Sequence, residues 1–63
     1  YLYMVSDKED LLIKYDEQKK KIVQKVKLEK GAWEGIAFDA KGNVYLADDD
    51  GRIVKYKKKA LGL

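Results

Sequence analysis

The amino-acid sequence predicts an all-β chain, an antiparallel meander of six strands arranged in propeller-blade-like sheets. A strand–turn–strand pattern occurs twice, at residues 3–15 and 45–56, with an offset of 41 or 42 residues. Repeats of about 40 to 45 residues that contain short strands are typical of propeller blades. The apolar segments have the length of strands, and Gly, Asn, Asp or Lys residues separate them.

The two copies of the repeat correspond residue by residue. The first copy reads Tyr3-Met4-Val5-Ser6-Asp7 and Leu12-Ile13-Lys14-Tyr15, and the second reads Tyr45-Leu46-Ala47-Asp48-Asp49 and Ile53-Val54-Lys55-Tyr56. The offset is 42 residues in the first part of the pattern and 41 in the second part, so the connecting turns differ by one residue. A single repeat cannot bury its apolar face alone. The pattern therefore informs on architecture more than on activity.

The first half of the chain predicts strands at residues 2–5, 11–15 and 22–28. The first is continuously apolar, as expected for a strand covered on both faces. The third alternates at its end, which places lysines on one face. A helix over residues 10–28 is the competing interpretation. We favour strands because the apolar residues do not hold an i, i+3, i+4 stripe and many are β-branched.

The second half predicts a loop at residues 29–34 and strands at residues 35–39, 44–47 and 52–57. Gly42 and Asn43 can take positive φ in the first turn, and Asp50-Gly51 favours a tight hairpin. No helix longer than one turn is expected. The predicted core contains Trp33, at least partly buried, and the apolar residues Leu2, Met4, Leu12, Ile36, Phe38, Val44, Leu46 and Ile53.

The size of the chain predicts association. Below about 70 residues a single core seldom supplies enough stability without disulfides, a metal or a partner. With no Cys and no His, the chain can form neither a disulfide nor a thiolate or imidazole metal site. We therefore expect a homo-oligomer. Lysines 25, 27 and 57–59 oppose unlimited growth at sheet edges, so we expect a closed assembly.

The charge pattern admits a nucleic-acid interface, but we favour another interpretation. Two lysine triplets, at residues 19–21 and 57–59, could contact phosphates, with tyrosines as stacking platforms. Most of the tyrosines lie within apolar strands, and acids alternate with the basic residues. We therefore expect a solvated turn, a solvated chain end and no nucleic-acid partner.

No apolar run approaches the ~20 residues that span a bilayer, so membrane insertion is not expected. The chain starts inside an apolar stretch without an initiator methionine, and we expect a fragment, natural or engineered.

The segments Trp33-Glu34-Gly35-Ile36-Ala37-Phe38-Asp39-Ala40-Lys41-Gly42-Asn43-Val44-Tyr45-Leu46-Ala47-Asp48 and Gly51-Arg52-Ile53-Val54-Lys55-Tyr56 resemble a blade of the NHL-like six-bladed β-propellers. Within that group they are most similar to the SdiA-regulated domain family. The resemblance implies about one and a half blades. Residues 1–30 would end one blade and residues 31–63 would start the next.

Glu34 is the one candidate metal ligand. In the similar gluconolactonase-like propellers, a glutamate in a matching Glu-Gly position helps to bind a divalent cation. Calcium commonly takes six or more oxygens, and in that family the other ligands come from other blades. We favour a loop carboxylate at Glu34, with calcium as the alternative. Asp48-Asp49-Asp50-Gly51 lacks the spacing of an EF-hand loop and predicts a hairpin turn instead.

Two function classes follow. Trp33 could stack on a ligand, although we favour packing between sheets. Ser6 has no histidine to activate it. We therefore expect a structural, self-associating propeller fragment with no catalytic residues, no cofactor and no enzymatic activity of its own. The alternative is a piece of a ligand-binding or divalent-cation-binding propeller, hydrolytic or not, with Glu34 and Trp33 near its axis.

Overall fold

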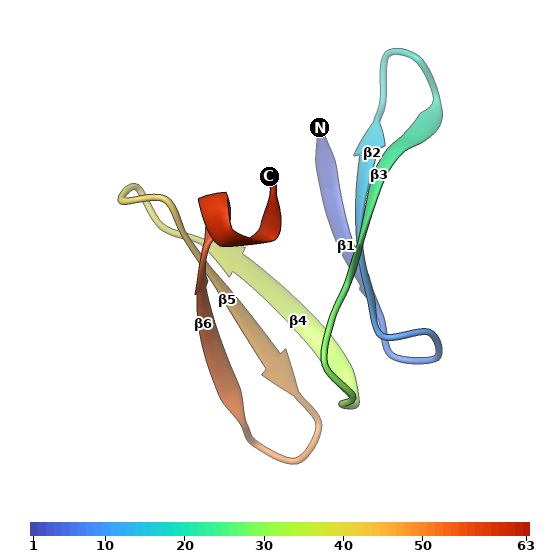
Figure 1. The fold of residues 1–63 in the computed structure, drawn as a ribbon. Coiled ribbons are helices and arrows are strands. Elements are labelled where there is room, and N and C mark those ends of the chain that lie inside the picture. The colour runs from blue at the N-terminus through green and yellow to red at the C-terminus, as the bar shows by residue number, and fades with distance from the viewer.

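The computed structural model describes residues 1–63 and shows two three-stranded antiparallel sheets (Figure 1). The first sheet contains β1 (Leu2–Ser6), β2 (Leu11–Asp16) and β3 (Lys21–Lys27), and the second contains β4 (Trp33–Phe38), β5 (Asn43–Asp48) and β6 (Ile53–Lys57). Within each sheet every strand pairs with its neighbour in sequence. The prediction of an all-β meander of six strands is confirmed.

The sequence repeat is also a repeat of strand register. In the first sheet, β1 and β2 pair Tyr3 with Lys14, Met4 with Ile13 and Val5 with Leu12. In the second sheet, β5 and β6 pair the corresponding residues, Tyr45 with Lys55, Leu46 with Val54 and Ala47 with Ile53. The chain therefore contains the same two-stranded unit twice.

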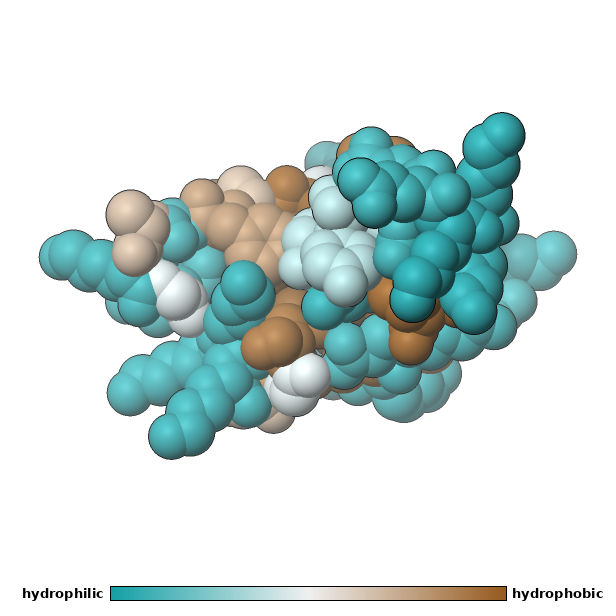
Figure 2. All heavy atoms as spheres, turned by 90° about the horizontal axis from the view of Figure 1, so that it is seen from above, coloured by the Kyte–Doolittle hydropathy of each residue, from teal (hydrophilic) through white to brown (hydrophobic).

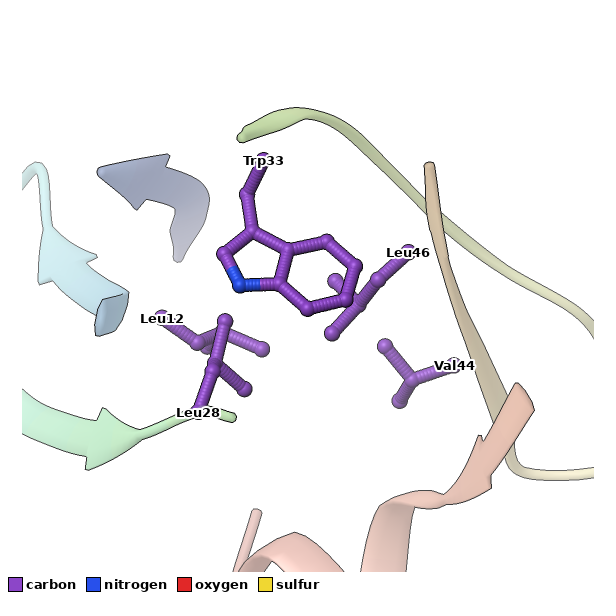
Figure 3. Close-up of a cluster of buried hydrophobic side chains, with 5 residues drawn as sticks. All are labelled: Leu12, Leu28, Trp33, Val44 and Leu46. Atoms are coloured by element: carbon purple, nitrogen blue, oxygen red, sulfur yellow. The ribbon is translucent and has the colours of Figure 1, made fainter. Parts of the chain in front are cut away.

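The core lies between the two sheets, on the faces that we call their inner faces. Trp33 points into this space, with Leu12 and Leu28 on one side of the indole and Val44 and Leu46 on the other (Figure 3). The Trp33 side chain is only 2% exposed, and its Nε1 donates a hydrogen bond to the Glu29 carbonyl oxygen at 2.9 Å. The predicted packing role of Trp33 is confirmed.

Four residues of the predicted core are exposed instead: Leu2, Met4, Phe38 and Ile53. Side chains alternate across a strand, and in this register Leu2, Met4 and Ile53 lie on the faces turned away from the other sheet, which we call the outer faces. Phe38 stacks on Tyr3 with ring centroids 4.6 Å apart, but it is still 38% exposed. Half-buried Ile36 packs against the core.

The second sheet starts earlier than predicted, and the chain end is folded. β4 begins at Trp33, within the predicted loop, and an irregularity in its pairing leaves Glu34 without a partner in β5. The predicted solvated chain end contains a 3-10 helix, η1 (Lys58–Leu61), which lies in the opening between the sheets (Figure 1). Leu61 and Leu63 pack against the core.

The space-filling view from above, the end at which both termini lie in Figure 1, shows apolar groups between hydrophilic side chains (Figure 2).

None of the helical structure in the chain has the length and apolar character that a membrane span requires.

Each hairpin contains one residue with positive φ. Gly42 and Gly51 take this conformation in the second sheet, as expected for Gly42, whereas Asn43 does not and begins β5 instead. In the first sheet the positive-φ residues are Asp10 and Lys20, at φ 54° and 55°. These two have a Cβ atom, so their turns hold some backbone strain.

We predict that Trp33→Ala lowers the free energy of unfolding by about 3–5 kcal/mol, because a fully enclosed aromatic side chain leaves a large cavity. Phe38→Ala is the matched control and should cost less, since Phe38 already contacts solvent. Urea midpoints from far-ultraviolet circular dichroism, which does not need Trp33 as a probe, test this prediction. Equal losses in the two variants would show that Trp33 is not the centre of the core.

We predict that Lys20→Gly stabilises the chain by up to about 1 kcal/mol, because glycine has no Cβ penalty at positive φ. The control is Lys19→Gly in the same turn, where φ is not positive. It should destabilise the chain, because glycine only adds freedom to the unfolded state. The two urea midpoints should move in opposite directions, and a shift of the same sign would contradict the strained turn.

Candidate functional site

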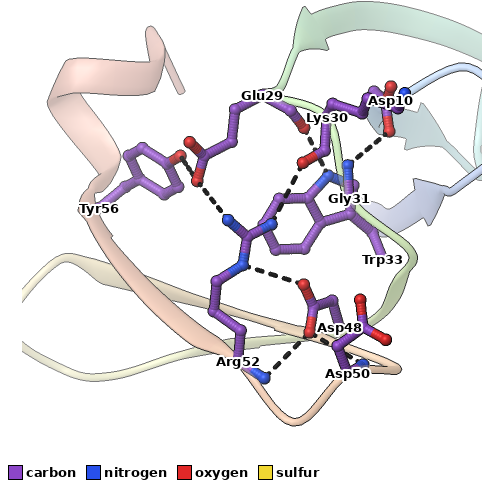
Figure 4. Close-up of polar contacts among 9 residues, drawn as sticks. All are labelled: Asp10, Glu29, Lys30, Gly31, Trp33, Asp48, Asp50, Arg52 and Tyr56. Carbon is purple, nitrogen blue, oxygen red and sulfur yellow. Dashed lines mark hydrogen bonds and ion pairs between the residues drawn. The ribbon is translucent and has the colours of Figure 1, made fainter.

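A network of hydrogen bonds and ion pairs lies beside Trp33, where the loop between the sheets meets the β5–β6 hairpin (Figure 4). We call it the Arg52 cluster, and it consists of Glu29, Trp33, Asp48, Arg52 and Tyr56. β4, β5 and β6 position Trp33, Asp48 and Tyr56, and the loop before β4 carries Glu29. Arg52 immediately precedes β6.

Asp48 and Arg52 form the centre of the cluster. The Asp48 carboxylate accepts hydrogen bonds from the backbone N–H and from Nε of Arg52, both at 2.9 Å. Asp48 is 5% exposed, the one buried charged residue of the chain. The backbone N–H of Arg52 is the main cause that lowers the pKa of Asp48, and the guanidinium adds to it. Asp48 is therefore held as a paired carboxylate.

The remaining faces of the Arg52 guanidinium are also occupied. Its central carbon lies 4.9 Å from the centre of the Trp33 ring, in a cation–π contact. One terminal nitrogen lies 3.6 Å from Glu29 Oε1, and the other donates to the Lys30 carbonyl oxygen at 3.2 Å. Arg52 therefore joins the loop between the sheets to the β5–β6 hairpin.

Tyr56 and Gly31 complete the surroundings of Arg52. The Tyr56 hydroxyl donates to Glu29 Oε1 at 3.4 Å, and burial, followed by the charge of Glu29, raises the pKa of Tyr56. A Cβ atom at Gly31 would lie 2.7 Å from a terminal nitrogen of Arg52 and 3.0 Å from the Trp33 ring. A side chain at this position would therefore require the guanidinium or the indole to shift.

A hollow of about 760 Å³ opens next to the cluster, between the β1–β2 turn, the loop before β4 and the β5–β6 turn. Its charged lining residues have both signs: Asp7, Lys8, Asp10, Lys30, Asp48, Asp50 and Arg52. No buried side-chain nitrogen or oxygen lacks a hydrogen-bond partner. The polar groups of the Arg52 cluster bind one another and hold the loop between the sheets against the β5–β6 hairpin.

Glu34 is exposed, at the irregularity in the pairing of β4 with β5. The structure brings together no group of three or more Asp, Glu, His or Cys side chains that could hold a metal ion. The role of Glu34 as a calcium ligand stays a prediction, for which calcium titration of the chain is the test.

The acidic run at residues 48–50 forms a turn, as its spacing predicts. Asp48 points inward to Arg52, whereas Asp49 and Asp50 are exposed. Arg52, Glu29, Tyr56 and Gly31 were not among the site residues predicted from the sequence. The available signal was an Asp three residues before a Gly, which occurs at Asp48 and again at Asp39.

Asp39 organises the other turn of the second sheet in the same way. Its carboxylate accepts backbone N–H groups of Lys41 and Asn43, both at 2.9 Å, and the Asn43 amide and the Tyr45 hydroxyl at 2.9 and 2.8 Å. These donors, with the Asn43 side chain first, lower the pKa of Asp39 to about 2, and the bond to Asp39 raises the pKa of Tyr45.

We predict that acid weakens the fold through Asp39. Because folding lowers its pKa, the stabilisation is complete above about pH 4 and is lost as the pH falls through about 2. Urea midpoints between pH 6 and 2 should therefore fall most steeply below pH 4. Asp39→Asn should be less stable at pH 6 and less sensitive to acid. Asp49→Asn, at an exposed carboxylate of the neighbouring turn, is the control and should keep the acid slope of the unaltered chain.

Comparison with known proteins finds a likeness to one propeller family in the second half of the chain. Residues 28–56 match the family model described as strictosidine synthase-like, N-terminal, which is a family of six-bladed propellers. The matched residues include β4, β5, most of β6 and the whole Arg52 cluster. No curated protein and no solved structure matches the chain. Residues 28–56 are therefore similar to a segment of the strictosidine synthase-like propellers.

Proposed function

We propose that the chain is a structural module: about one and a half blades of an NHL-like propeller, similar to the SdiA-regulated type, that self-associates and has no enzymatic activity of its own. The observation that carries this proposal is the apolar surface left uncovered. Only five apolar residues are buried, whereas seven large apolar residues are exposed: Tyr1, Leu2, Met4, Ile22, Val23, Phe38 and Ile53.

The sheet edges support the same proposal. Each sheet has three strands, so β1, β3, β4 and β6 each pair on one side only. Unpaired strand edges present backbone N–H and C=O groups to solvent and are sites where another chain can add. Exposed apolar surface and open edges together favour a partner, because burial on association supplies stability that a chain of this size seldom reaches alone.

The chemistry of the Arg52 cluster supports a structural role over a catalytic one. An activated nucleophile needs a general base within hydrogen-bond reach and a group that orients the base. Arg52 and Asp48 bind each other, and Glu29 binds Arg52 and Tyr56. The module therefore acts as a propeller building unit, and the cluster holds the loop between the sheets against the β5–β6 hairpin.

We expect static light scattering of the folded chain at micromolar concentration to give two or more times the 7.3 kDa chain mass. The thermal midpoint should rise with concentration, because association stabilises the folded state by mass action. A cooperatively folded sample of 7.3 kDa whose midpoint does not depend on concentration would refute the proposal.

A further inference from the structure

The two copies of the repeat have opposite faces covered. In the β1–β2 unit the covered residues are Tyr3, Val5 and Leu12, which face the second sheet. In the β5–β6 unit the covered residues are Val44, Leu46 and Val54, which face the first sheet. These sets do not correspond under the repeat, since Leu12 is equivalent to Ile53 and Leu46 is equivalent to Met4.

Each outer face therefore repeats the composition of a face that is covered within the chain. The outer face of the second sheet carries Tyr45, Ala47 and Ile53, the equivalents of the covered Tyr3, Val5 and Leu12. Ile53 is 71% exposed, whereas Leu12 is fully buried. Similar apolar residues at the same register are thus covered in the first copy and exposed in the second. A surface like the inner face of the second sheet would cover them.

The outer face of the first sheet likewise carries the equivalents of residues that are covered in the second sheet. Leu2, Met4 and Ile13 lie at the positions that Val44, Leu46 and Val54 occupy in the second copy. In the second copy these residues form or flank the core, packed against the first sheet. In the first copy nothing covers Leu2 and Met4.

The two outer faces differ in relief. An apolar hollow of about 310 Å³ lies on the second sheet, and Gly35, Ala37 and Ala47 are small residues in its lining, beside Tyr45 and Ile53. The bond from the Tyr45 hydroxyl to Asp39 fixes the ring at this surface before any partner arrives. The outer face of the first sheet presents larger exposed side chains, among them those of Leu2, Met4 and Ile22.

We propose that the outer face of the second sheet of one copy packs on the outer face of the first sheet of another copy, head to tail. The contact reproduces between chains the sheet-on-sheet interface that lies within the chain. This inference rests on the proposed self-association and specifies its surface. Such an interface joins two different surfaces, and repetition of it closes into a ring when the rotation per copy allows. Association by addition of edge strands is the alternative mode.

Both outer faces also carry lysines. Lys55 lies on the outer face of the second sheet and is equivalent to Lys14, whose ammonium lies 4.2 Å from the centre of the Tyr1 ring. Lys25 and Lys27 pair with Ile13 and Leu11, so they lie on the outer face of the first sheet, at its edge strand β3. Lysine side chains can cover apolar surface with the stem and keep the charge in water.

Light scattering of single lysine variants tests the surface. Ile53→Lys and Met4→Lys each place a charge in one outer face, and both residues are exposed, so the fold should persist by circular dichroism. Both variants should give the 7.3 kDa monomer mass. Ala40→Lys adds the same charge in the exposed β4–β5 turn and should keep the mass of the unaltered chain. Unchanged mass in both face variants would refute the head-to-tail surface while self-association stands.

Disulfide trapping tests the same surface without a charge in the interface. The chain has no cysteine, so a mixture of Ile53→Cys and Met4→Cys chains can form only engineered disulfides. A head-to-tail contact should give the mixed dimer under mild oxidation, and neither variant alone should cross-link. Efficient cross-linking of Ile53→Cys with itself would overturn the proposal in favour of a two-fold contact. A monomeric unaltered chain would instead remove the proposed function together with this inference.

Discussion

The structure depends on the burial of Trp33 between the two sheets. Each sheet has only three strands and buries its inner apolar face against the other sheet. The indole contacts residues from both, Leu12 and Leu28 on one side and Val44 and Leu46 on the other. An aromatic ring of this size supplies more apolar area than any other side chain in the core. Trp33, at the start of β4, therefore joins the two sheets, together with the stack of Phe38 on Tyr3.

The Arg52 cluster stabilises this arrangement from its polar side. The indole Nε1 is satisfied by a loop carbonyl, and the guanidinium lies over the ring while it binds Asp48 and the loop. A buried carboxylate without such partners would be costly. Because Arg52 contacts the loop and the hairpin together, movement of the second sheet relative to the loop would break several hydrogen bonds at once. The polar cluster and the apolar core thus hold the same junction.

The same architecture leaves apolar surface uncovered. Both sheets carry apolar residues on both faces, and their contact covers only one face of each. The remaining faces carry the repeat equivalents of the covered residues. The hollow beside the Arg52 cluster is lined by charged residues of both signs. The charged residues of the cluster bind each other, so they stabilise the fold.

The sequence by itself determined the six strands, their order as a meander and the repeat, because apolar segment length, Gly and Asp turns and the 41- or 42-residue offset are local or periodic signals. It also indicated that Trp33 packs between sheets. Only the tertiary structure decided which apolar face is covered. Leu12 and Ile53 are equivalent in sequence, yet one is fully buried and the other is exposed. The difference arises because burial depends on whether a second sheet lies over that face, and the sequence of a strand does not record which of its two apolar faces has a neighbour.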